Sequence, residues 1–162
     1  RAHAALGNVH EADAALARLR EISRQSELAH LKMEFNSSRN LSAIAERVLT
    51  GWNSVAAGDL DAAIAAIQQA VRLEKELLYG ESPEWSVPTL QDLGAVLLLA
   101  NQAAEAEGVF RADLNQFPEN GWSLYGLIRA LKAQDKHAEA AEYESVLERV
   151  WSTADVVLED VF

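Results

Sequence analysis

Cysteine is absent from the 162 residues, so the chain can form no disulfide and has no thiolate for catalysis or metal binding. This fits a reducing compartment, and we expect a cytoplasmic protein. Proline (3) and glycine (8) are scarce, whereas alanine, leucine and glutamate are abundant, which favours helices. No apolar run approaches the roughly 20 residues of a membrane span.

Positive charge is in short supply, with 14 Lys and Arg against 25 Asp and Glu, for a formal net charge of -11. A non-specific nucleic-acid binder needs a basic face, so we expect no nucleic-acid partner. The same charge disfavours an anionic membrane surface, and it mildly favours neutral or basic partners, although solubility is the simpler interpretation. The chain opens with Arg1 and lacks a signal-peptide core, so we expect a fragment or a processed product.

Motifs that carry catalysis or metal binding are missing as well. There is no G-x-G-x-x-G, P-loop or G-x-S-x-G sequence. His10-Glu11 begins an H-E-x-x-H pattern, but Ala14 stands where the second histidine is needed, and the other histidines, His3, His30 and His137, are scattered. Most acidic residues have the spacing of a solvated helix face, such as Glu105, Glu107, Glu139 and Glu142. We therefore expect neither an enzyme nor a cofactor or metal site.

Four breakpoints share one context. Each lies between two helical stretches, and each is followed five residues later by an alanine that can pack closely: Gly7 and Ala12, Gly58 and Ala63, Asn101 and Ala106, and Asp135 and Ala140. Gly, Asn and Asp are the residues that accept left-handed backbone or cap the next helix. The recurring offset indicates an internal repeat.

Apolar residues at helical spacing predict an all-α protein. The predicted helices run from about His10 to Phe35, Leu41 to Val55, Leu60 to Tyr79, Leu90 to Leu99, Ala103 to Phe117, Trp122 to Ala133, and His137 to Trp151. No segment alternates with a period of two for long enough to indicate a strand.

The segment from Val87 to Asn120 has the length and spacing of a known repeat. It reads Leu90-x2-Leu93-Gly94-x2-Leu97, then Ala106-x3-Phe110, then Pro118. It resembles a tetratricopeptide repeat, whose signature is W-x2-L-G-x2-Y, A-x3-F and P, with Leu in place of Trp and Tyr. The resemblance implies a right-handed superhelical stack of antiparallel helix hairpins, in which Gly94 and Ala106 let two helices approach closely.

The neighbouring units match this repeat by register only. Gly51 and Ala63 repeat the gap between Gly94 and Ala106, and the last unit holds Ile128 and Glu144 in the Gly and Phe positions. We predict one domain over residues 1–162, with a truncated hairpin at 1–39, hairpins at 40–79 and 87–120 separated by a loop at 80–86, a C-terminal hairpin at 121–152 and a tail at 153–162. Segments such as Glu84-Trp85 and Pro118 to Leu127 also resemble the C-terminal part of larger bacterial tetratricopeptide proteins.

In that family the first helix of each hairpin lines a concave groove. Carried over by register, the groove residues are Trp52, Gln91, Trp122, Tyr125 and Arg129, and Trp85 in the loop is a candidate lid. The alternatives are that Trp52 belongs to the core, that Trp122 packs on Phe117, and that Trp85 packs onto the ends of the hairpins. Residues 122, 125 and 129 share one face of a helix, opposite Leu124, Leu127 and Leu131, so we expect Trp122 and Tyr125 to be partly exposed, with Arg129 on the same side.

The function expected from this arrangement is a non-enzymatic scaffold that binds a protein or peptide segment, or another part of its own parent chain. A second hypothesis is that the chain closes a larger ligand- or metal-binding protein whose polar site lies further upstream. A His-rich helical region in the full-length sequence would favour this second hypothesis.

Overall fold

The computed structural model describes residues 2–25, 31–33, 35–81, 83–155 and 158. Helices make up 72 % of it and pack as adjacent pairs along the sequence, which is consistent with a helical stack. The chain divides into two compact units, Arg1–Thr89 and Leu90–Phe162. In the described part of the chain, no helix has the length and apolar character needed to cross a membrane.

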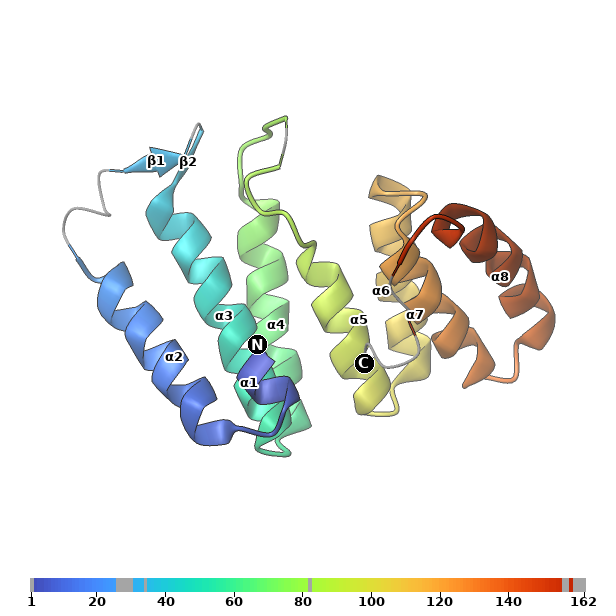
Figure 1. Ribbon diagram of the computed structural model, residues 1–162, viewed down its shortest axis with the longest axis horizontal. Helices are drawn as coiled ribbons and strands as arrows, with labels where there is room; N and C mark the ends of the chain where they lie inside the picture. Colours follow the sequence, from blue (N-terminus) through green and yellow to red (C-terminus); the bar gives the residue numbers. More distant parts are fainter. Residues whose placement is uncertain (1, 26–30, 34, 82, 156–157, 159–162) are drawn as a thin grey trace. The chain divides into compact units, whose positions relative to one another are not determined.

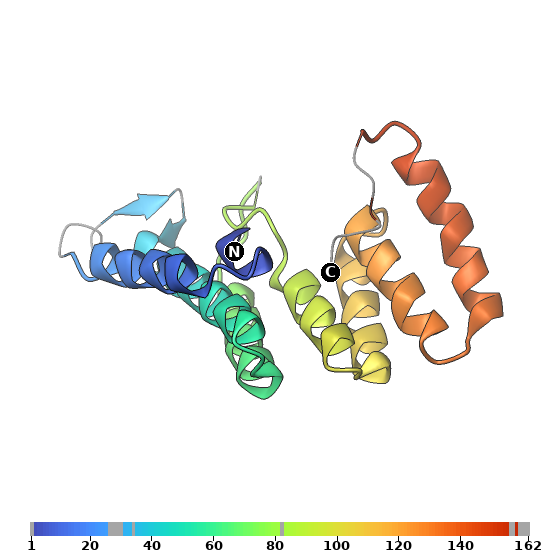
Figure 2. The same cartoon turned by 60° about the horizontal axis from the view of Figure 1, so that its bottom comes forward.

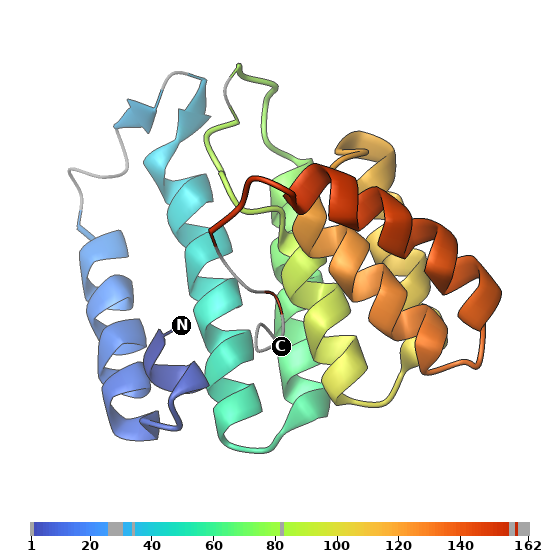
Figure 3. The same cartoon turned by 45° about the vertical axis from the view of Figure 1, so that its right-hand side comes forward.

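The first unit contains α1 (Ala2–Ala5), α2 (Val9–Ser23), α3 (Ser38–Ala56) and α4 (Leu60–Lys75). Helices α2, α3 and α4 lie side by side, and α1 packs on both α2 and α3 (Figures 1 and 3). The core between them consists of small, branched and aromatic residues at helical spacing, including Ala12, Leu16, Ile44, Val48, Trp52, Ala63 and Ile67.

The second unit contains most of α5 (Thr89–Leu99), and then α6 (Ala103–Gln116), α7 (Gly121–Lys132) and α8 (His137–Trp151). Helix α7 packs against both α6 and α8, and Figure 2 shows α7 and α8 joined by the short turn at Asp135. The side chains of Phe110, Leu124, Leu127 and Leu131 are at most 2 % exposed, so they form the centre of this unit.

The four predicted breakpoints form the same turn. Gly7, Gly58, Asn101 and Asp135 all adopt left-handed backbone, with φ of 71°, 81°, 58° and 60°. In each turn the next residue donates its N–H to the carbonyl five positions back, at 2.8–3.0 Å: Asn8 to His3, Asp59 to Ser54, Gln102 to Leu97, and Lys136 to Leu131. This is a Schellman motif, which satisfies the carbonyls at a helix C-terminus. The prediction for these four positions is confirmed.

The alanine that follows each turn is equally regular. The same four residues, Asn8, Asp59, Gln102 and Lys136, accept the N–H of Ala12, Ala63, Ala106 and Ala140 at 3.0–3.1 Å, which starts the next helix. These alanines are at most 3 % exposed, so all four are buried. The turn and the buried alanine therefore recur together four times along the chain.

Two hairpins also share a close contact between a glycine and a large residue. A Cβ at Gly94 would overlap the Phe110 ring, and a Cβ at Gly51 would overlap the Ile67 side chain. Phe110 and Ile67 each follow the buried alanine of their hairpin by four positions. The expected close approach of α5 and α6 at Gly94 is thus present. Gly126 of α7 packs against the same Phe110 ring, since a Cβ at Gly126 would overlap it as well.

The prediction of one helix from His10 to Phe35 is wrong. Helix α2 ends at Ser23, whose hydroxyl donates back to the carbonyl of Leu19 at 2.8 Å, and a small antiparallel pair follows, β1 (Lys32–Met33) with β2 (Asn36–Ser37). Apolar residues at helical spacing stop at Ile22, and Ser37 caps α3 by accepting the N–H of Asn40. The expectation that the chain has no strand is therefore corrected too.

Helix α4 is also shorter than predicted, ending at Lys75 instead of near Tyr79. The backbone of Leu78 bonds to the buried Asn36 side chain instead of continuing the helix: its N–H donates to Oδ1 at 2.8 Å, and its carbonyl accepts from Nδ2 at 3.0 Å. A single side chain thus competes with the helical hydrogen bonds at this end.

We predict that Gly94→Leu and Ala106→Phe each lower the free energy of unfolding by about 3 kcal/mol or more, because α5 and α6 can no longer approach. Gly108→Ala is the matched control in α6, since nothing lies within 4 Å of a Cβ there, and it should stabilise the protein by about 0.5–1 kcal/mol. Thermal unfolding followed by circular dichroism measures all three, and unchanged melting temperatures for Gly94→Leu and Ala106→Phe would refute this packing.

Candidate functional site

Helix α7 has two chemically different faces. Leu124, Leu127 and Leu131 are at most 2 % exposed, whereas Trp122, Tyr125 and Arg129 are all partly exposed. The guanidinium carbon of Arg129 lies 5.9 Å from the centre of the Tyr125 ring, so the two side chains are on the same side of the helix. The predicted exposure and orientation of these residues are confirmed. We call Trp122, Tyr125 and Arg129 the α7 stripe.

The indole of Trp122 is held by the end of α8. Its ring meets the Trp151 ring edge-on, with centroids 5.4 Å apart and planes at 80°. Gly121 makes room for Trp151, because a Cβ at this position would overlap that ring. The Trp122 indole therefore has a fixed position although part of it stays accessible, while Phe117, the neighbour expected from the sequence, is 39 % exposed.

A buried carboxylate fixes the beginning of α7. Asp113 is 0 % exposed, and its Oδ2 accepts from Ser123 Oγ at 2.5 Å and from Asn120 Nδ2 at 3.1 Å. Asn120 also caps α7 by accepting the N–H of Trp122 at 3.1 Å. Gln91 of α5 adds a further hydrogen bond to the Asp113 carboxylate. We call Gln91, Asp113, Asn120 and Ser123 the Asp113 clamp, and it joins α5, α6 and the N-terminal end of α7.

Burial raises the pKa of Asp113 above its usual value of 3.8, against the opposing effect of the bonds from Ser123, Gln91 and Asn120. Its other oxygen, Oδ1, is enclosed without a hydrogen-bond partner among the described residues.

Two of the predicted groove residues, Trp52 and Gln91, are placed differently from the expectation. Trp52 is only 7 % exposed and belongs to the core of the first unit, as its alternative stated. Gln91 is 9 % exposed, and its side chain is hydrogen-bonded to Asp113 within the clamp. It is therefore a structural residue and not a groove residue. In both cases the side chain lies where neighbouring helices cover it, which register alone does not reveal.

Trp85 lies half-buried in the loop between α4 and α5, and its Nε1 is enclosed without a hydrogen-bond partner among the described residues. The adjacent Glu84 ties this loop to the strand pair, because its Oε1 accepts from the N–H of Phe35 at 2.9 Å and of Asn36 at 3.4 Å. These bonds favour the interpretation in which Trp85 packs onto the hairpin ends of its own unit.

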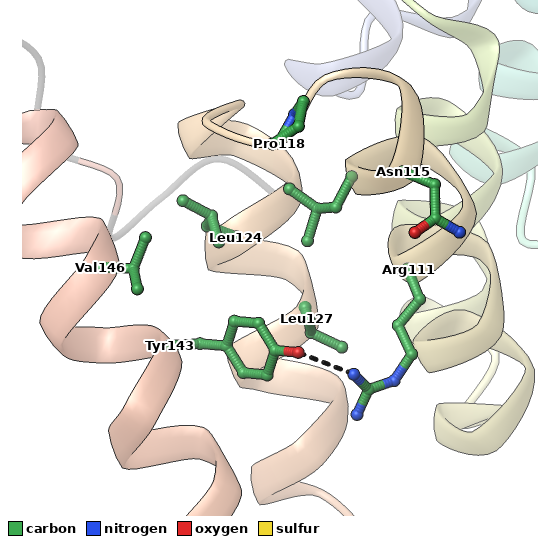
Figure 4. A pocket seen from close by; sticks show the side chains of 8 residues that line it. Arg111, Asn115, Pro118, Leu124, Leu127, Tyr143 and Val146 are labelled. Atoms are coloured by element: carbon green, nitrogen blue, oxygen red, sulfur yellow. Dashed lines mark hydrogen bonds between the residues drawn. The ribbon is translucent and has the colours of Figure 1, made fainter.

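An ion network that the sequence analysis missed joins α6 to α8. Arg111 donates to Glu107 Oε1 at 2.9 Å, to Glu139 at 2.5 Å and to the Tyr143 hydroxyl at 2.8 Å (Figure 4), and Lys136 contacts Glu107 Oε2 at 2.6 Å. Glu107 is therefore not part of a solvated face, since its side chain is only 14 % exposed. The hydrogen bond from Lys136 is the main cause that lowers the pKa of Glu107 from 4.5 to about 2.

Three of the four histidines, His3, His10 and His137, lie within the described ranges. Within the described ranges, no three His, Asp or Glu side chains are placed to hold a metal ion, and His30 lies outside these ranges. In the described part of the chain, the ion pair of His137 joins its Nε2 to Oδ1 of the neighbouring Asp135 at 3.6 Å.

Comparison of the chain with models of protein families, with curated proteins and with solved structures finds no match. The repeat family therefore stays a prediction from the residues quoted above, and the candidate site depends on the geometry of this chain alone.

We predict that Asp113→Asn keeps full stability at neutral pH, whereas Asp113→Ala costs about 1–3 kcal/mol because Ser123 and Asn120 lose their acceptor. The raised pKa means that the native state holds the proton more tightly than the unfolded chain, so this contribution to stability is lost as pH rises from 3.8 through the native pKa. Urea unfolding between pH 3 and 7 should show that dependence in the wild type and not in Asp113→Asn, and equal curves for the two proteins would contradict it.

We also predict that Glu107→Gln lowers stability at neutral pH by about 1–2 kcal/mol, because Lys136 and Arg111 lose a charged partner. Since the pKa of Glu107 is lowered from 4.5 to about 2, the stabilisation is complete above pH 4.5 and disappears as the pH falls toward 2. Acid unfolding of the variant should therefore be less steep in this window. Glu105→Gln, an exposed position on the same helix, is the control and should match the wild type.

Proposed function

We propose that the chain is a non-enzymatic interaction domain of tetratricopeptide type, in which the α7 stripe binds a segment of a partner protein or another part of its own parent chain. The recurring turn, the buried alanine after it and the glycine contacts of Gly94 and Gly51 support the repeat type. The same proposal includes the right-handed superhelical stack that such repeats form.

The observation that carries the proposal is the composition of the exposed face of α7. Its opposite face already supplies the leucines of the core, whereas Trp122, Tyr125 and Arg129 stay partly exposed on this one. These residue types dominate the binding energy of protein interfaces, because they combine a large apolar area with directional hydrogen bonds. Two of these side chains already have an aromatic neighbour before binding, since Trp122 meets Trp151 edge-on and the guanidinium carbon of Arg129 lies 5.9 Å from the centre of the Tyr125 ring.

The chemistry of the stripe indicates what kind of segment it fits. The two rings offer an apolar surface, and the guanidinium of Arg129 adds a positive charge that favours a carboxylate in the partner. A strongly acidic segment is repelled by the net charge of -11. We therefore expect a segment with apolar side chains and a single carboxylate, such as one at the end of a chain.

A displayed library of random peptides of about 12 residues, selected against the wild-type domain, tests this function. Tyr125→Ala and Arg129→Gln should each weaken the selected peptides by about tenfold in fluorescence polarisation. Tyr79→Ala and Arg72→Gln remove the same residue types from exposed positions of the first unit, and they should leave binding unchanged. Peptides that bind all four variants equally would contradict the assignment to the α7 stripe, as would a selection that yields none.

A further inference from the structure

We propose a second binding site on this protein, for a small neutral amphiphile, in the cleft between α6, α7 and α8 (Figure 4). The cleft has a volume of about 400 Å³ and lies wholly within the second unit. This volume falls in the range of roughly 300–1,000 Å³ that is usual for small-molecule sites.

Five of the eight residues that line the cleft are apolar. Leu124 and Leu127 form its floor, and they are 2 % and 0 % exposed. Leu114 and Val146 line the walls from α6 and α8, and Pro118 lies at the end away from Tyr143 (Figure 4). Such a lining favours a hydrocarbon chain or ring over a polar molecule, because a polar group placed against it would lose its hydrogen bonds to water.

One end of the cleft offers a directed hydrogen-bond donor. Arg111 Nη1 donates to the Tyr143 hydroxyl at 2.8 Å (Figure 4). Since a guanidinium can only donate, the Tyr143 oxygen is the acceptor in this bond, and its own O–H is left to donate. A ligand whose polar end carries a hydroxyl, ester or amide oxygen matches this donor.

The charge at this end selects a neutral ligand. Arg111 is balanced by Glu107 at 2.9 Å and Glu139 at 2.5 Å, and Lys136 in turn contacts Glu107 at 2.6 Å. Two cations thus meet two carboxylates, and the lowered pKa of Glu107 keeps it ionised at neutral pH. A charged head group would lose its hydration here. Binding would be unfavourable, because the opposite charges at this end of the cleft are already paired with one another.

The cleft is independent of the proposed protein-binding surface. Leu124 and Leu127 lie on the opposite face of α7 from Trp122, Tyr125 and Arg129, since residues that line one face of a helix recur every three or four positions. The inference therefore goes beyond the proposed function, and either can fail without the other.

Titration with octan-1-ol, octanoate and octylammonium tests the cleft, because these probes share a chain and differ in charge. In methyl NMR spectra, octan-1-ol should shift the signals of Leu114, Leu124, Leu127 and Val146 until they saturate at one equivalent. Both charged probes should bind about tenfold more weakly. Tyr143→Phe should weaken octan-1-ol by about fivefold, since one hydrogen bond is lost. Shifts that do not saturate, or equal binding of all three probes, would overturn the proposal.

A charge placed at the rim provides a test that leaves the core intact. Asn115 lines the cleft and its side chain is exposed, and Gln116 beside it is exposed but does not line the cleft. Asn115→Lys should strengthen octanoate binding by about tenfold and leave octan-1-ol within about twofold. Gln116→Lys adds the same charge and should change neither probe. Identical behaviour of the two lysine variants would show that the cleft does not bind the head group.

Discussion

The packing of one phenylalanine ring against two glycines is the constraint on which the second unit depends. Phe110 is 0 % exposed, and a Cβ at either Gly94 or Gly126 would overlap its ring. Helix α6 is thereby held close to α5 on one side and to α7 on the other. Because protein interiors are as densely packed as organic crystals, small residues at such crossings set the distance between helices.

The surfaces of α7 follow from this close packing. The leucine face of α7 packs in the core, the Asp113 clamp fixes the first turn of the helix, and Trp151 of α8 packs against Trp122. The α7 stripe and the cleft are then two sides of one rigid helix, with an aromatic and basic surface on one side and an apolar hollow on the other. A change in the Phe110 contact would therefore disturb both sites.

Much of the fold was predictable because it depends on local signals. Left-handed turns at Gly7, Gly58, Asn101 and Asp135 and the alanines after them depend on residue type and spacing, and so does the two-faced nature of α7. The end of α4 was not predictable, since it is set by Asn36, which is 42 residues from Leu78 in the sequence. The burial of Trp52 and Gln91 and the ion network of Arg111 likewise depend on contacts between helices, which a pattern within one helix does not contain.

A double-mutant cycle between Gly94→Ala and Phe110→Ala tests the central packing contact most directly. In the wild type the added methyl group must displace the Phe110 ring, so Gly94→Ala should cost about 2 kcal/mol, although alanine favours the helix. In the Phe110→Ala background there is no ring to displace, and the same substitution should be neutral or stabilising. Urea unfolding of the four proteins measures a coupling energy that we expect to be about 2 kcal/mol. Additive effects would contradict the account, because they would show that Gly94 and Phe110 do not share this contact.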